Sequence, residues 1–207
     1  MKTKIAVVCM FLLACTGVAA HADSIDLNGS DYTLSYTPTG TPKVYDVTLT
    51  IDASGYAGGT SDFLNDIALK VVKKGDIGSI LVLSAPAGYD TSVETGGLGS
   101  QGCKGNSSAY FCLDYTGGGD GLAVGSSGDV YTFSFLVDVD KSKDLLTGMD
   151  DAALKILYDN SRGKSAGVSK GKLTLTESTT PEPSSMALLG TALVGLALLA
   201  KKMGGAV

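Results

Sequence analysis

The sequence predicts an all-β protein whose body is a single antiparallel β-sandwich of about eight strands with long glycine-rich loops. The first observation behind this prediction is that short segments of alternating apolar and polar residues recur between residues 32 and 176. A period of two is typical of half-buried antiparallel strands. The second observation is that Gly-, Asp- and Ser-rich segments separate the alternating ones, as turns in such folds require.

The expected strands follow one another with no internal repeat and no second domain boundary before residue 177. The most regular lies at 131–139, where apolar residues occupy every second position. The full set of expected strands covers 32–36, 45–51, 67–71, 79–83, 109–115, 131–139, 154–158 and 173–175. Between them we expect irregular loops at 86–102 and 116–129, a polar stretch with one helical turn at 141–151, and a polar loop or hairpin end at 159–171.

The N-terminus, residues 1–22, has the features of a secretory signal peptide. Two lysines precede an apolar run at 5–14, and a small-x-small cleavage site ends at Ala22, directly before Asp23. We therefore expect signal peptidase to cut between Ala22 and Asp23. A rival cleavage site lies before Cys15, where processing as a lipoprotein would leave a lipidated cysteine.

The C-terminal segment, 179–207, combines a rigid tripeptide with a short apolar run. In Pro181-Glu182-Pro183, the prolines fix two φ angles and remove two backbone donors, so the chain stays extended and accessible. As a helix, the 15 apolar residues at 186–200 would cover only about 22 Å, against a bilayer core of roughly 30 Å. The two lysines at 201–202 mark the cytoplasmic end of this short transmembrane helix, which places the body of the protein outside.

This arrangement resembles the PEP-CTERM sorting signal of Gram-negative bacteria over residues 181–202. The resemblance implies an exosortase, a membrane protease-transpeptidase, as the processing partner. It also implies that Pro181, Glu182 and Pro183 are recognised, that the helix anchors the chain only transiently in the inner membrane, and that the product reaches the cell surface or an extracellular matrix rich in exopolysaccharide. The two lysines and five further residues depart from the usual terminal cluster of arginines.

The composition of the expected mature range, 23–180, excludes several classes of function. Its 12 basic and 20 acidic side chains give a net charge of about −8, which argues against nucleic acid and anionic membranes as partners. The only histidine, His21, precedes the expected cleavage site. Mechanisms that use Ser-His-Asp or Cys-His, and zinc or copper sites that need histidine, are therefore excluded. We expect no cofactor and no catalytic activity.

Cys103 and Cys112 are the two cysteines that remain once the signal peptide is removed. In an oxidising compartment they predict one disulfide. In the chain-entropy model, closing so small a loop stabilises the fold by roughly 2–3 kcal/mol. A redox pair or a thiolate metal site is the alternative, but the spacing is not Cys-x-x-Cys and no second pair of ligands accompanies it.

Aspartates and tyrosines in or beside the loops are the remaining candidates for a binding site. Hard oxygen ligands for Ca²⁺ would come from Asp138, Asp140 and Asp144, or from Asp114, Asp120 and Asp129. Neither set matches an EF-hand loop, and the alternative is that these are solvated turn residues. Sugars would stack on Tyr56, Tyr89, Tyr110 and Tyr115. The alternative for these rings is packing in the core or at its rim.

Three classes of function stay open at this point. The first is an exported, exosortase-processed structural protein of the cell surface or of a biofilm matrix, without catalysis. The second is a carbohydrate- or Ca²⁺-binding β-sandwich module. The third is a glycoside hydrolase that uses paired carboxylates, which needs no histidine.

Overall fold

The computed structural model describes residues 24–59, 62–73, 75–100, 102–105, 109–118, 120–140, 144–148, 151–160 and 165–178. All regular elements in these ranges are β-strands, and no helix there is long and apolar enough to cross a membrane. The expected signal peptide with its cleavage site at Ala22 and Asp23, and the whole of 179–207, lie outside the described residues. The described residues belong to one compact unit, His21–Ser178.

The first sheet is antiparallel along its main path, in the order β1-β2-β3-β11-β5. A two-residue strand, β14, joins it in parallel beside β2. The strands of this sheet are β1 (Ser24–Leu27), β2 (Ser30–Pro38), β3 (Val44–Asp52), β5 (Ile77–Ser84), β11 (Val130–Val139) and β14 (Thr176–Glu177).

The second sheet is antiparallel in the order β13-β12-β4-β9-β6, with β10 paired to β4. A small separate hairpin-like pair, β7-β8, lies next to it. The strands of these two groups are β4 (Asp62–Lys70), β6 (Glu94–Thr95), β7 (Gly97–Gly99), β8 (Gly102–Gly105), β9 (Phe111–Leu113), β10 (Leu122–Ala123), β12 (Ala152–Asn160) and β13 (Ser165–Leu173).

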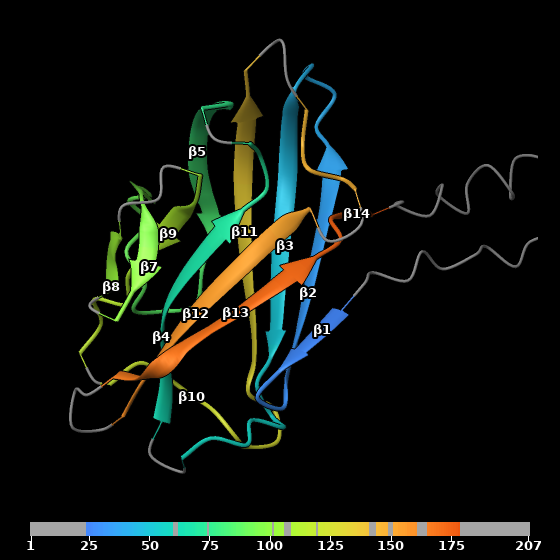
Figure 1. Ribbon diagram of the computed structural model, residues 1–207. Helices are drawn as coiled ribbons and strands as arrows, with labels where there is room; N and C mark the ends of the chain where they lie inside the picture. The colour runs from blue at the N-terminus through green and yellow to red at the C-terminus, as the bar shows by residue number, and fades with distance from the viewer. Residues whose placement is uncertain are drawn as a thin grey trace, which may run out of the picture. The chain divides into compact units, whose positions relative to one another are not determined.

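Side chains from both sheets form one hydrophobic core, in a sandwich-like arrangement (Figure 1). Buried and less buried positions alternate along β3 and β11, as the period of two predicts. The fully buried residues include Tyr32, Leu34, Leu49, Phe133 and Phe135 from the first sheet and Ile67, Leu69, Leu154 and Ile156 from the second. The prediction of an all-β fold with antiparallel sheets is confirmed.

The sequence analysis missed the first strand, β1. Asn28 and Gly29 join β1 to β2, and both residues have positive φ, at 58° and 79°. A two-residue turn of that kind is the connection that matches the twist of a β-hairpin, and Asn-Gly is its preferred sequence. The Asn-Gly pair was therefore the signal that could have found β1.

Of the two alternatives predicted for 159–171, a polar loop or a hairpin end, the structure favours the second, because β12 and β13 are antiparallel neighbours. The strand is longer than expected, since β13 covers 165–171 of this segment. Apart from Leu173 at the end of the strand, the inward positions of β13 carry Gly171, Ser169 and Gly167 rather than large apolar residues. No alternating pattern therefore appears in the sequence of 165–171. A Cβ atom at Gly171 would overlap the Cδ1 atom of Ile25. Ile25 on β1 thus fills the space that side chains of β13 would otherwise occupy.

The predicted irregular loops contain short strands. β6 and β7 lie within 86–102, and β10 lies within 116–129. These strands of two or three residues are too short to show a period of two in the sequence. The expected helical turn at 141–151 does not occur in the described part of that stretch, 144–148 and residue 151.

Candidate functional site

The outer face of the second sheet, which points away from the main core, carries a second and smaller hydrophobic cluster. It contains Ala68 on β4, Leu157 on β12 and Leu98 on β7 together with the two cysteines. β7 contacts both β4 and β12, so the β7-β8 pair covers one part of this outer face. Another part of the same face remains open.

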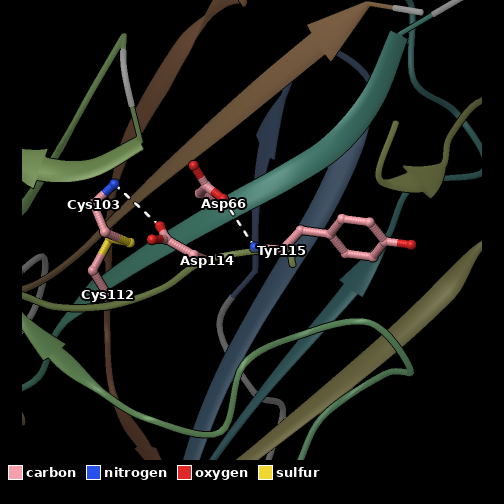
Figure 2. The surroundings of a disulfide bond; sticks show 5 residues. All are labelled: Asp66, Cys103, Cys112, Asp114 and Tyr115. Carbon is pink, nitrogen blue, oxygen red and sulfur yellow. Dashed lines mark hydrogen bonds between the residues drawn. A yellow bond between two sulfur atoms is a disulfide. The ribbon is translucent and has the colours of Figure 1, made fainter. Parts of the chain in front are cut away.

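The predicted disulfide is confirmed within this cluster. Cys103 on β8 and Cys112 on β9 are bonded, and both are buried. Their pairing ties the β7-β8 pair to β9 and hence to the second sheet (Figure 2). The disulfide therefore keeps the β7-β8 pair packed over the small cluster.

Two carboxylates lie beside the disulfide (Figure 2). The backbone N–H of Tyr115 donates to Asp66 at 3.0 Å, and the N–H of Cys103 donates to Asp114 at 3.2 Å. Burial, and next to it the charges of Asp114 and Asp159, raise the pKa of Asp66 to about 6, although the bond from Tyr115 acts in the opposite direction. Asp66 is buried, whereas Asp114 is only partly buried.

The open part of the outer face forms a groove of about 420 Å³ that is lined by four lysines. Lys70 comes from β4, Lys155 from β12, and Lys170 and Lys172 from β13. We call this feature the basic groove. Asp151 is the only acidic residue among those that line it, although the expected mature chain carries a net charge of about −8.

The strand register places these lysines close to one another. Lys155 is directly opposite Lys170, while Lys70 and Lys172 lie on either side of Ala153. Like charges at directly opposed positions of an antiparallel pair are destabilising. None of the four takes part in an ion pair with another described residue. The four lysines thus concentrate positive charge on the open part of this face.

Tyr110 connects the disulfide cluster to the basic groove. The ring packs against the small cluster and also lines the groove. The ammonium group of Lys155 lies 4.4 Å from the centre of that ring, a distance at which a cation is attracted to the aromatic face. Tyr110 thus holds Lys155 in the groove.

A second concave site, of about 580 Å³, lies where β1, the loop after β3, and β13 meet. Its lining includes Asp26, Asn28, Tyr56 and Tyr158. The side chain of Asn28 donates to the hydroxyl of Ser169 at 2.7 Å, so polar groups here already satisfy each other. No concentration of one charge marks this site, and we consider the basic groove the stronger candidate.

The structure does not bring either predicted set of aspartates together. The only described group of three residues with converging ligand atoms is Cys103, Cys112 and Asp114, and its cysteines are already in the disulfide. Asp144 pairs with Lys43. Asp129 accepts a backbone bond from Ser126 at 2.7 Å, as a turn aspartate does. The predicted Ca²⁺ ligand sets therefore do not form in the described residues.

Three of the four predicted sugar-stacking tyrosines are engaged in ring packing. Tyr89 is 8% exposed and makes edge contacts with Phe133 and Tyr115. Tyr56 stacks on Tyr158, with ring centres 4.4 Å apart. Tyr110 alone of the four lines the basic groove. Sequence reasoning missed the groove lysines, although the Lys-Gly-Lys spacing at 170–172 was a usable signal.

The sorting residues Pro181, Glu182 and Pro183 lie outside the described residues. A family model, the PEP-CTERM protein-sorting motif, matches residues 179–202. The chain thus carries this sorting motif, which implies export, transient membrane anchoring and an exosortase as processing partner.

Comparison with other proteins finds distant structural similarity. No curated protein matches the chain. Among solved structures, the chain is similar to ACE19, the collagen-binding subdomain of the Enterococcus faecalis surface protein ACE, with 7% sequence identity and a TM-score of 0.29. That match covers 71% of this chain and 95% of the other. A likeness this distant carries no argument about this chain.

Proposed function

Because residues 179–202 carry a PEP-CTERM sorting motif, we propose that this chain is an exported structural protein of the cell surface or extracellular matrix, without catalytic activity. The sorting motif is the observation that carries the proposal. In it, signal peptidase removes residues 1–22, the β-sandwich 23–178 is the functional ectodomain, and an exosortase removes the segment after Pro181-Glu182-Pro183. Exopolysaccharide is the expected environment of the product.

The absence of catalysis is supported by the residues that the mature chain would lack. Its only histidine, His21, would leave with the signal peptide. Asp66 and Asp114 are a pair of carboxylates of the kind that hydrolases use, since one has a raised pKa. Neither residue lines the basic groove or the site at β1 and β13. Asp66 is buried, so a substrate would meet only the partly buried Asp114, which disfavours the hydrolase alternative.

The test of the sorting step uses the full chain in its native host. Glu182→Ala and Pro183→Ala should leave export and the fold intact but block removal of the tail, so the uncleaved protein should accumulate in the inner membrane. Intact mass of each cell fraction measures this. A matched control is Glu177→Ala, which changes a glutamate outside the matched motif. If the Glu182 and Pro183 variants are trimmed and released like wild type, the tripeptide is not the recognition element and the proposed sorting step fails. If the wild type itself keeps its tail in the inner membrane, the chain is a tethered periplasmic domain and the proposal fails as well.

A further inference from the structure

We propose that the basic groove binds an acidic polysaccharide, with Lys155 and Lys170 as its central contacts and Lys70 and Lys172 at its sides. Nothing in the sorting motif specifies this site. The inference depends on the proposed function only in that export brings the domain to such polymers.

The charge of the groove becomes more favourable when an anion binds. The like charges of Lys155 and Lys170 face each other across the β12-β13 pair, and no described carboxylate forms an ion pair with either. Lys155 is partly buried and Lys170 is exposed. A bound carboxylate between them would replace mutual repulsion with two charge-assisted hydrogen bonds.

The extent of the groove fits a chain molecule better than a small ion. Lys70, Ala153 and Lys172 lie side by side on three adjacent strands. The Cα atoms of the two outer lysines are therefore about 10 Å apart, which is twice the distance between neighbouring strands. Four lysines distributed over three strands offer more positive groups than one small anion needs. They suit a ligand that carries its negative groups at intervals.

The surrounding charge favours a sparsely charged polymer over nucleic acid. The expected mature chain has a net charge of about −8, which repels a polyanion in proportion to the density of its charge. Duplex DNA carries a negative charge about every 1.7 Å along its axis, whereas an acidic polysaccharide carries at most one on each sugar ring. The net negative charge of the protein therefore repels an acidic polysaccharide less strongly than it repels DNA. Attraction by four lysines is better able to overcome that weaker repulsion.

The experiment measures binding of the purified full chain to alginate, used as a polyuronate probe, and to dextran, used as its neutral counterpart. Alginate should bind with an affinity that falls as salt is raised, and dextran should not bind. The double variant K155Q/K170Q should weaken alginate binding by roughly tenfold or more. The matched control K73Q/K104Q removes the same charge from two exposed lysines outside the groove and should bind like wild type.

A stability measurement separates a binding role from a structural one. Alginate should raise the Tm of the wild type and of K73Q/K104Q, by mass action on the folded state, but not that of K155Q/K170Q. Without ligand, the Tm of K155Q/K170Q should stay close to that of wild type. The variant loses the contact between Lys155 and the Tyr110 ring, but it also loses the repulsion between the two lysines.

Any of four results overturns the proposal. These are the absence of alginate binding, an equal loss of affinity in both double variants, a Tm of K155Q/K170Q without ligand far below that of wild type, or tighter binding to duplex DNA or to phosphatidylglycerol vesicles than to alginate. The binding assay is independent of tail processing. Failure of this inference and failure of the proposed sorting step are therefore distinguishable.

Discussion

Replacing Asp66 with asparagine should stabilise the protein at neutral pH and leave its stability unchanged in acid. Asp66 is buried beside Asp114, and burial with neighbouring negative charge raises its pKa to about 6, from an ordinary value of 3.8. The folded state therefore holds its proton at a pH where the unfolded chain has released it. Above the folded pKa, the native state contains an ionised carboxylate in an unfavourable position.

The size of the effect follows from the difference between the two pKa values. A difference of about two units corresponds to roughly 3 kcal/mol of stability, since each unit is worth about 1.4 kcal/mol. That contribution is present below about pH 4 and is lost as pH rises from there through about 6. A domain of this kind has a total stability of about 5–15 kcal/mol, so the loss is a large part of it.

Asparagine has nearly the same shape as aspartate but no charge. Its side-chain oxygen can still accept the N–H of Tyr115, which donates to Asp66 at 3.0 Å. Its amide group carries no charge for Asp114 to repel, whereas the negative charge of Asp114 raises the pKa of Asp66. We therefore expect Asp66→Asn to gain about 1–3 kcal/mol at pH 7.5, which corresponds to a rise in Tm of about 3–10 °C.

Urea unfolding of both proteins at about pH 3.5, 5 and 7.5 measures the prediction. The gain should be near zero at the lowest pH and largest at the highest. Asp90→Asn is a control in which the free energy of unfolding at pH 7.5 should fall rather than rise. The N–H of Ser92 donates to Asp90 at 2.8 Å and holds its pKa below the usual value, so the ionised carboxylate is favourable there. A gain for Asp66→Asn that does not change with pH, or a loss at pH 7.5, would refute the reasoning.

Two further predictions concern the disulfide and metal ions. The double variant C103A/C112A should lose about 2.6 kcal/mol of unfolding free energy in the chain-entropy model for a sequence separation of 9, measured as a lower urea midpoint. Reductant should move the wild type to the same midpoint without affecting the variant. A variant as stable as the oxidised protein would contradict this. Melts with EDTA and with added Ca²⁺ should coincide, because neither aspartate set converges in the described residues, and a large rise in Tm with Ca²⁺ would show that these loops bind it.

The sequence by itself determined the features whose cause is local. Alternation along 131–139 fixed which side of β11 is buried, because side chains of a strand point alternately to opposite faces. Two remaining cysteines were enough to predict the bond between Cys103 and Cys112. The tripeptide Pro181-Glu182-Pro183 and the apolar run behind it were enough to identify a sorting motif that needs no folded context.

Only the tertiary structure decided the features that depend on register between distant strands. β13 is a strand although its inward residues are small, because Ile25 from β1 fills the space above Gly171. The basic groove exists because β12 pairs with β4 on one side and with β13 on the other, which brings Lys70 together with lysines at least 85 positions away in the chain. No local pattern encodes that proximity, since it arises from hydrogen bonding between strands whose order in the sheet differs from their order in the sequence.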